Sequence, residues 1–218
     1  KAMGATMFHW GLHPWAIYAV VALSLAFFSY NKGLPLTIRS AFFPFIKDRS
    51  WGWFGHLIDV VAVLATIFGL ATSLGFGAQQ AAGGLKFLFD IPNTINTQIA
   101  IIVGVTAVAI VSVVRGLDGG VKVLSNINMT LAVILLLFVV IVGQGLTIFG
   151  DLLDTSGAYL ENLMPLSSWV GREYEKFYHG WTVFYWGWWI AWCPFVGLFI
   201  ARVSKGRTIR QFCFCVLL

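Results

Sequence analysis

Charged side chains are scarce in this sequence. Aspartate, glutamate, lysine and arginine make up 11% of its 218 residues, less than half of the roughly 25% found in soluble domains. A soluble fold of this size needs a polar surface, which such a composition cannot supply. Hydrophobic residues make up 59% of the chain, and the mean hydropathy is +0.84. The composition excludes a soluble domain and predicts a polytopic membrane protein.

Motifs of catalysis and of metal binding are also missing. The sequence has no GxxxxGK[ST] phosphate-binding loop, no serine–histidine–aspartate pattern and no zinc-ligand spacing. Its three cysteines fit neither a metal site nor a disulfide framework. His9 and His13 are four residues apart but lack an acidic or cysteine companion nearby, which disfavours a metal site. We therefore expect neither an enzyme nor an ATPase.

Long apolar runs fill most of the chain instead. Runs of about 20 such residues indicate membrane-spanning helices, so the expected fold is all-α. Residues 79–94 are rich in glycine and polar side chains and are expected to form a loop with at most a short helix. Residues 151–166 mix apolar and acidic side chains, which favours an amphipathic helix in the membrane interface. The five predicted spans are residues 14–30, 57–77, 99–114, 123–149 and 181–200.

Lysine and arginine residues set the expected orientation. The net charge of +5 could suggest nucleic acid, but the basic residues lie in short gaps between apolar runs. The loops after the first, third and fifth runs hold ten of the 14 basic residues, which the positive-inside rule places in the cytoplasm. Asp59 opens the second run on this side, as expected for an acid at a helix N-terminus. The prediction is a multi-pass membrane protein that contacts lipid and binds no nucleic acid.

Seven of the ten tryptophans lie in two segments. The segment WTVFYWGWWIAWCPFVG begins at Trp181, and Tyr185, Trp189 and Trp192 lie on one helical face within it. Pro194 and Gly197 follow, and we expect the helix to break or bend there, as in transporters with discontinuous helices. The segment HWGLHPWAIY in the first run holds the second cluster. Its aromatic members are Trp10, Trp15 and Tyr18.

Two such clusters on different helices can form a cage for a quaternary ammonium group. This group has no N–H to donate, but its diffuse charge is attracted to the faces of aromatic rings, by roughly 2 kcal/mol or more in a dry site. The alternative is an aromatic belt at the membrane surface. Trp188, Trp189 and Trp192 lie two to three turns into the fifth run, beyond the reach of such a belt.

Neutral oxygens within the runs offer a second kind of site. Thr66 in the second run and Ser125 and Asn128 in the fourth could coordinate Na+, which needs several oxygen ligands. The alternative is hydrogen bonding between helices, which Ser, Thr and Asn commonly provide in membranes.

Four motifs resemble the betaine/carnitine/choline transporter (BCCT) family, and the resemblance covers nearly the whole chain. They are HWGLHPWAIYA, LSNINM, WTVFYWGWWIAWCPFVG and FIARVSKGRTIRQF. The resemblance implies a LeuT-type fold of twelve spans with two inverted five-helix repeats, of which this chain resembles spans four to eight. The chain begins at a lysine and stops within an apolar run, so we expect a piece of a longer protein.

The resemblance also implies the site residues. The substrate cage would comprise Trp10, Trp15, Tyr18, Trp189 and Trp192, with Trp186 and Trp188 along the access route. The sodium ligands would be Thr66, Asn128 and the region of Phe195, with Ser125 nearby. Leu70 stands where some sodium-coupled members carry a second threonine. This departure weakens the sodium assignment and keeps proton coupling open.

The resemblance implies a secondary transporter that takes up quaternary ammonium osmolytes by alternating access, coupled to Na+ or H+. The motif WCPFVG lacks the polar residues associated with carnitine exchangers, which favours glycine betaine or choline. Uptake of carnitine or of the sulfonium dimethylsulfoniopropionate stays open, as does a membrane sensor that only binds such ligands. Residues 151–166 resemble a helix that packs between protomers of family trimers, so a homotrimer is expected. Five spans cannot build two repeats, so these 218 residues alone should not transport.

Overall fold

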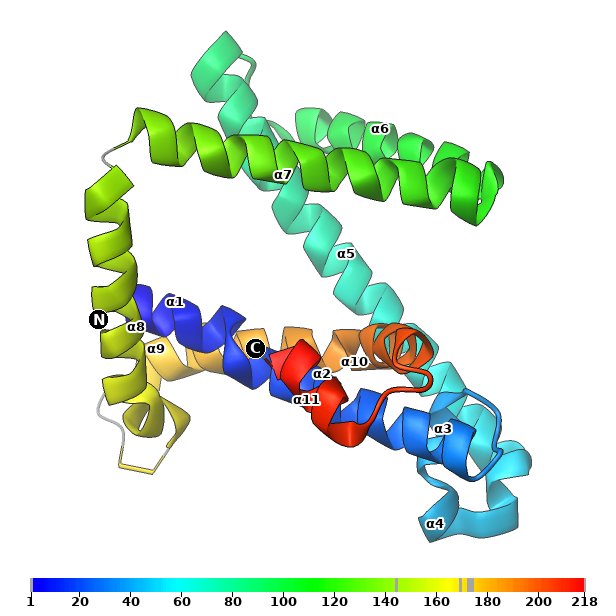
Figure 1. Cartoon of the computed structure of the whole chain (residues 1–218). Coiled ribbons are helices and arrows are strands. Elements are labelled where there is room, and N and C mark those ends of the chain that lie inside the picture. The colour runs from blue at the N-terminus through cyan, green and yellow to red at the C-terminus, as the bar shows by residue number, and fades with distance from the viewer. Residues whose placement is uncertain (1, 144, 169, 172–174, 218) are drawn as a thin grey trace. The chain divides into compact units, whose positions relative to one another are not determined.

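A computed structural model describes residues 2–143, 145–168, 170–171 and 175–217 of the chain (Figure 1). Every regular element in these residues is a helix. Five helical segments are long and apolar enough to cross a membrane, which confirms the all-α polytopic fold. The chain forms two compact units, one made of residues up to Thr72 together with those from Thr155 on, and the other of Ser73–Asp154.

The first spanning segment is interrupted near its start. Helix α1 (Ala2–Trp10) ends one residue before α2 (Leu12–Ala26), and a π-helical turn, η1 (Phe27–Asn31), completes the segment. The interruption lies at Gly11, whose N–H donates to the Met7 carbonyl over 2.7 Å. A Cβ at Gly11 would lie 2.5 Å from that oxygen, so only glycine fits.

The second segment is longer than the sequence predicts. Helix α5 (Trp53–Phe89) continues without interruption through most of the expected loop at residues 79–94 (Figure 1). It ends only at Asp90, which adopts a positive φ of 56°. Glycine in a helix costs only about 1 kcal/mol relative to alanine, and Gly83 and Gly84 do not interrupt α5. The prediction of a loop there is wrong.

Short helices connect α2 to α5, and an ion pair links the first of them to α5. They are α3 (Ile38–Ala41), α4 (Phe43–Ile46) and the 3-10 turn η2 (Lys47–Trp51). Arg39 in α3 lies 2.8 Å from the Asp59 carboxylate, and the Arg39 backbone N–H donates to the same carboxylate over 3.1 Å. Because α5 begins at Trp53, Asp59 lies in its second turn and binds Arg39, rather than being a charge at the helix end as predicted.

The second unit contains α6 (Ile95–Val114) and α7 (Lys122–Val142), joined through the π-helical turn η3 (Leu117–Val121). Helix α7 ends before the predicted limit at Phe149. The next helix, α8 (Gly145–Ser167), begins within the predicted span and holds the predicted interfacial segment 151–166. Within the predicted span 123–149, residue 144 lies outside the described residues.

The fifth segment consists of α9 (Glu175–Phe177), the π-helical turn η4 (Tyr178–Val183) and α10 (Phe184–Val203). We expected a break or a bend at Pro194, and helix α10 runs through it without interruption, so a break there is wrong. Proline removes one backbone hydrogen bond, and the helix continues around it. Gly197 instead permits close packing, since a Cβ there would lie 2.7 Å from Val21 Cγ1 of α2.

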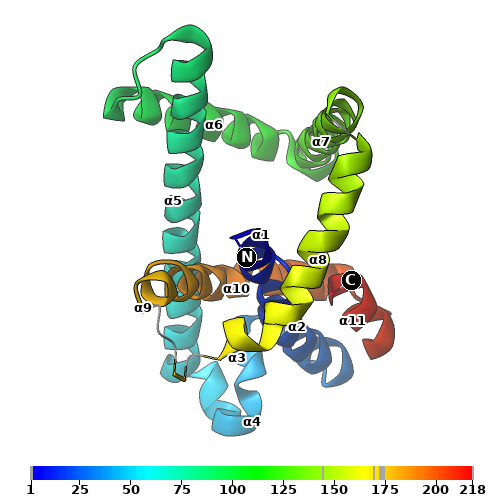
Figure 2. The same cartoon turned by 90° about the vertical axis from the view of Figure 1, so that its left-hand side faces the viewer.

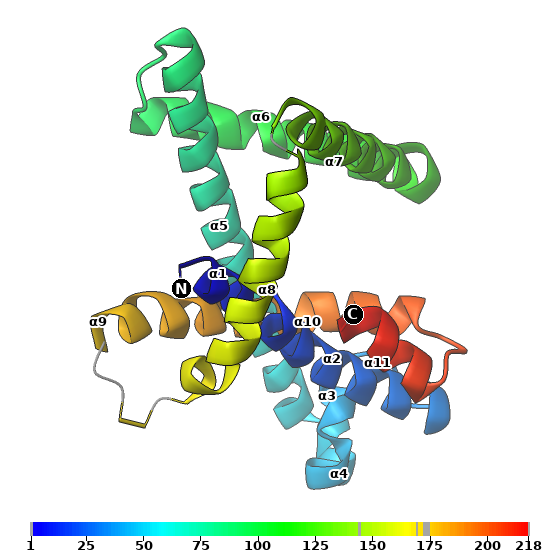
Figure 3. The same cartoon turned by 60° about the vertical axis from the view of Figure 1, so that its left-hand side comes forward.

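Helices α2 and α10 form the core of the first unit (Figures 1 and 3). Their contacts advance in the same direction along both helices, from Tyr18 against Trp189 to Tyr30, whose hydroxyl donates to the Ala201 carbonyl over 3.1 Å. The two helices are therefore parallel, as expected for the first and fifth of five alternating spans. Helix α11 (Ile209–Leu217) packs back against α2 (Figures 2 and 3).

Candidate functional site: an aromatic cluster between two spans

Two tryptophans from separate spanning segments are in direct contact. The ring centroids of Trp10, at the end of α1, and Trp189, in α10, lie 4.8 Å apart in an edge-to-face arrangement. Trp188 stacks parallel to Trp189, with centroids 5.4 Å apart and an interplanar angle of 3°. The rings of Trp188 and Trp10 are also arranged edge-to-face, with centroids 6.0 Å apart. The structure thus brings together rings that are about 180 residues apart in sequence.

Tyr18 and Trp15 extend this cluster along α2. Tyr18 is buried and meets Trp189 edge-to-face, with centroids 6.1 Å apart. Trp15 meets Tyr18 at 5.8 Å but is 45% exposed. It lines a groove of about 420 Å³ together with Phe212 and Val216 of α11. Trp15 is therefore at the margin of the cluster.

Two other predicted site residues on α10 lie elsewhere: Trp186, predicted along the access route, and Trp192, predicted in the cage. Trp186 packs against Phe8 and His13, with centroid distances of 5.2 and 5.7 Å. Trp192 lies 5.7 Å from Phe195 and also faces α5, where a Cβ at Gly69 would come within 3.3 Å of its indole ring. The ring of Trp192 therefore supports the contact between α10 and α5.

The spacing of the central rings limits what they can hold. A cation recognised by aromatic faces lies within about 6 Å of each ring centroid. The 4.8 Å between Trp10 and Trp189 is too short for a methylated ammonium group between them. An occupied cage in that position requires one of these two rings to move.

His9 is a part of this site that the sequence prediction missed. The indole Nε1 of Trp189 donates to the His9 backbone carbonyl over 2.9 Å. The His9 ring nitrogen Nε2 lies 3.1 Å from the Thr182 hydroxyl, and its ring stacks on Tyr185 at 4.9 Å. Its spacing from His13 suggested only a metal site, and no motif in the sequence indicates a contact with η4 and α10.

Two of the candidate cation ligands share a cavity in the first unit. Thr66 on α5 and Phe195 on α10 line a space of about 410 Å³ that also includes Asp59. The Thr66 hydroxyl donates to the Ala62 carbonyl over 2.9 Å. This bond uses the hydroxyl proton and leaves oxygen lone pairs that can coordinate a cation.

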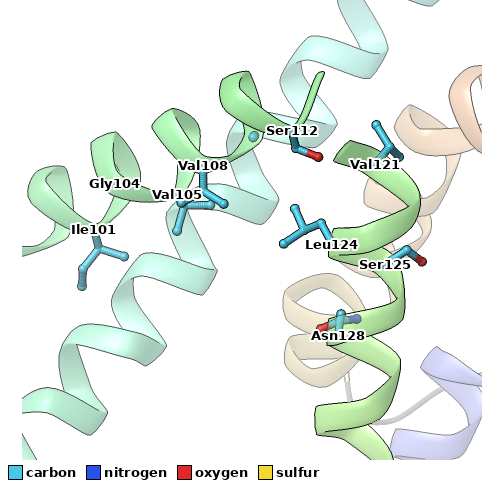
Figure 4. Close-up of a pocket in the computed structure, with 10 residues that line it drawn as sticks. Ile101, Gly104, Val105, Val108, Ser112, Val121, Leu124, Ser125 and Asn128 are labelled. Atoms are coloured by element: carbon cyan, nitrogen blue, oxygen red, sulfur yellow. The ribbon is translucent and has the colours of Figure 1, made fainter. Parts of the chain in front are cut away.

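The other two candidate ligands lie in the second unit. Ser125 and Asn128 on α7 line a groove of about 780 Å³ between α6 and α7 (Figure 4). Ser112 near the end of α6 lies on its other side (Figure 4). The remaining lining is mostly aliphatic. The structure therefore shows the four predicted sodium ligands as two pairs, each within its own unit.

Outside the spanning segments, Tyr159 of α8 is buried beside the break between α1 and α2. A Cβ at Gly11 would lie 4.0 Å from its hydroxyl. Burial raises the pKa of Tyr159, with a smaller opposing effect from the Leu12 backbone. The phenol therefore stays neutral at physiological pH, and α8 contributes a polar but uncharged group next to this break.

Comparison with known proteins agrees with this architecture. The chain is 61% identical over 217 residues to glycine betaine transporter 1 of Vibrio parahaemolyticus, covering 100% of this chain and 41% of that protein. It is 60% identical over 216 residues to a glycine betaine/proline/choline/ectoine transporter of the same organism, covering 99% of this chain and 38% of the relative. Glycine betaine transporter OpuD of Bacillus subtilis is 48% identical over 219 residues, with 99% and 43% covered.

The chain thus spans about two fifths of the length of these curated relatives. The family model described as the betaine/carnitine/choline family transporter matches residues 1–218. Proteins of this family are multi-pass membrane transporters rather than enzymes, in line with the five apolar helices. The aromatic cluster and the match over every residue together show that the chain belongs to the betaine/carnitine/choline transporter (BCCT) family.

Proposed function

We propose that the full-length protein takes up quaternary ammonium osmolytes, glycine betaine or choline, across the bacterial inner membrane by alternating access. The observation that carries this proposal is the meeting of Trp10 and Tyr18 with Trp189, on two separate spans. A fully methylated ammonium group is recognised by ring faces because it cannot donate a hydrogen bond. The names of the relatives from Vibrio and Bacillus point to the same substrate class.

The movement required for transport follows from the same rings. Because Trp10 and Trp189 are in contact, a substrate held between them requires one of the two rings to move, which a separation of α1 from α10 would provide. In a LeuT-type scaffold of inverted repeats, rocking of one helix bundle against the other supplies such a movement around a site at the membrane midplane. We assign this chain to the part of the scaffold that resembles spans four to eight.

We further propose that transport is coupled to an ion, with Na+ as the first candidate. Thr66 and Phe195 line one cavity, and Ser125 and Asn128 line another. The hydroxyl oxygens of Thr66 and Ser125 and the amide oxygen of Asn128 are hard ligands that suit Na+. Leu70 offers no oxygen in the turn after Thr66, so H+ coupling is the competing proposal.

The assembly is proposed to be a homotrimer in contact with membrane lipid. The amphipathic helix α8 supports this proposal, because Leu160 and Met164 are exposed on its surface. Exposed apolar residues on an interfacial helix fit either lipid or a neighbouring protomer. Mass measurement of the full-length protein in detergent or nanodiscs distinguishes a trimer from a monomer.

Uptake measurements test the substrate and the coupling ion together. The full-length protein is expressed in cells that lack other osmolyte uptake systems, and labelled glycine betaine, choline, carnitine and dimethylsulfoniopropionate are supplied with and without Na+. We expect saturable uptake of glycine betaine or choline, and Thr66→Val should weaken its dependence on Na+. Preference for the sulfonium or for carnitine would replace the substrate assignment. Binding without uptake would indicate a sensor.

A further inference from the structure

His9 and Thr182 form a buried polar pair next to the aromatic cluster. We propose that this pair is a positioning element that fixes the orientation of Trp189 relative to Trp10, and thereby sets the affinity for substrate. The inference rests on the proposed function, in which these two rings bind the substrate. Neither His9 nor Thr182 needs to touch the substrate for this role.

The hydrogen bonds on either side of His9 connect α1 to η4 and α10. The His9 carbonyl accepts from Trp189 Nε1 over 2.9 Å, and His9 Nε2 lies 3.1 Å from Thr182 Oγ1. His9 is 3% exposed, Thr182 1% and Trp189 9%. Water therefore cannot readily replace either bond, and the loss of one leaves a buried polar group unsatisfied.

Ring stacking holds the imidazole from a second direction. The planes of His9 and Tyr185 are 21° apart, with centroids at 4.9 Å. Tyr185 in turn lies nearly parallel to Trp189, at 6.2 Å and 20°. A shift of the His9 ring is therefore transmitted to Trp189 both through the backbone carbonyl and through Tyr185.

The break at Gly11 explains why the His9 carbonyl serves a side-chain donor. Helix α1 ends at Trp10, and the last carbonyls of a helix lack intrahelical partners. Pro14 has no N–H, so the usual bond from position 14 to the Trp10 carbonyl cannot form either. The interruption in the first segment thus turns backbone acceptors toward neighbouring elements, and Trp189 uses one of them.

His13 and Ser167 provide a matched control pair. His13 Nε2 lies 2.9 Å from the Ser167 hydroxyl, which repeats the chemistry of His9 and Thr182 one turn further along the chain. That bond is exposed and fastens the end of α8 rather than Trp189. A variant at Ser167 therefore removes the same kind of bond without disturbing the orientation of Trp189.

The test compares three variants of the full-length protein in labelled glycine betaine uptake. Thr182→Val keeps the shape and removes the hydroxyl, and we expect the KM to rise about tenfold while kcat changes less than about twofold. Thr182→Ser restores the hydroxyl, and its KM should stay within about twofold of the wild-type value. Ser167→Ala should leave both parameters unchanged.

A measurement independent of transport separates this inference from the proposed function. The protein is labelled with 5-fluorotryptophan, and the ¹⁹F resonance of Trp189 is assigned by its absence in Trp189→Phe. We expect Thr182→Val to shift or broaden this resonance, whereas Ser167→Ala leaves it in place. A wild-type protein that transports none of the osmolytes would refute the proposed function, and the resonance alone would then decide the positioning role.

Unchanged KM and an unchanged Trp189 resonance in Thr182→Val would overturn the proposal. Should that variant not accumulate in the membrane, His9→Gln serves instead. Its amide can still reach Thr182, but it cannot stack on Tyr185, so we expect a smaller rise in KM and a shifted resonance. Wild-type values for both in His9→Gln would equally refute the positioning role.

Discussion

The α2–α10 pair and the two helices α6 and α7 use their apolar side chains in different ways. Helices α6 and α7 are the more apolar of the four, yet no residue in the most apolar stretch of either one is buried. Helices α2 and α10 are less apolar and form the buried core of their unit. Hydropathy measures how well a helix suits lipid, and it does not measure how well the helix binds another helix.

The residues at the α2–α10 contact explain the difference. Lipid chains are as apolar as leucine, so helices associate in membranes through close packing and hydrogen bonds. Ala22 and Ala201 are fully buried there, and Gly197 admits Val21. The indole–carbonyl bond between Trp189 and His9 adds a polar contact. Small and polar residues therefore identify a helix contact that hydropathy alone does not show.

The largest effect is expected from filling the space at Gly197. Gly197→Leu would push a side chain into Val21, whose Cγ1 lies 2.7 Å from a Cβ at that position, and overpacking of this kind costs about 3 kcal/mol. We expect a strongly lowered Tm of the purified full-length protein and little uptake. The matched variant in α6 is Gly104→Leu, because a Cβ there meets nothing within 4 Å. If the two variants unfold at similar temperatures, the contrast between the regions is wrong.

A buried and an exposed leucine provide the second comparison. Leu25 in α2 is 1% exposed, and Leu25→Ala should lower the free energy of unfolding by about 3 kcal/mol through lost packing and the cavity left behind. Leu136 in α7 is 63% exposed, so Leu136→Ala should cost less than about 0.5 kcal/mol. Thermal unfolding of the full-length protein in detergent measures both. A large loss at Leu136 would show that α7 packs against protein.

The third comparison concerns function rather than stability. Trp189→Ala removes the ring between Trp10 and Tyr18, and the loss of about 2 kcal/mol of cation–π attraction should raise the KM for glycine betaine about 30-fold. Trp53→Ala is the control and should leave the KM unchanged, since this exposed ring contacts Phe54 and none of the predicted cage residues among the described ring contacts. Equal KM values for Trp189→Ala and wild type would remove Trp189 from the cage.

The smallest effect is expected at the ion pair that fastens α3 to α5. Arg39→Gln breaks the 2.8 Å contact with Asp59, but both side chains remain partly exposed, so the cost should be about 1 kcal/mol or less. Chemical denaturation at low and high salt checks this value. High salt screens the ion pair, so the difference in free energy of unfolding between the wild type and Arg39→Gln should become smaller. Lys86→Gln at the other end of α5 removes the same charge without a described ion pair and should be neutral. A larger cost at Lys86 would contradict this ranking.

Composition and hydrophobic runs were enough to predict the all-α membrane fold. The scarcity of charge and the length of the apolar runs leave no soluble alternative. In lipid, backbone polar groups have to be satisfied within the protein, and runs of about 20 apolar residues do this by forming helices. The two tryptophan clusters suggested that rings of the first and fifth segments could meet, and Trp10 and Trp189 do meet. The use of these rings as a substrate cage remains a proposal.

Local signals were less reliable where tertiary contacts compete with them. Pro194 predicted a break in α10, but the helix continues, and the interruption lies at Gly11 of the first segment. Gly83 and Gly84 predicted a loop, but α5 passes through them. A proline or a glycine raises the free energy of a helix by a few kcal/mol at most. Whether the helix still forms depends on its packing and its apolar surroundings.

The sequence by itself determined that this chain crosses a membrane, which segments are apolar, and which residues share a helical face, because these properties depend on composition and on a fixed period along one helix. Only the tertiary structure decided that Trp189 meets Trp10 while Trp192 turns toward α5, that Gly197 admits Val21, and that His9 binds both Thr182 and Trp189. The physical reason is that contacts between distant helices depend on how closely their surfaces fit, and the periodicity of neither helix encodes that fit.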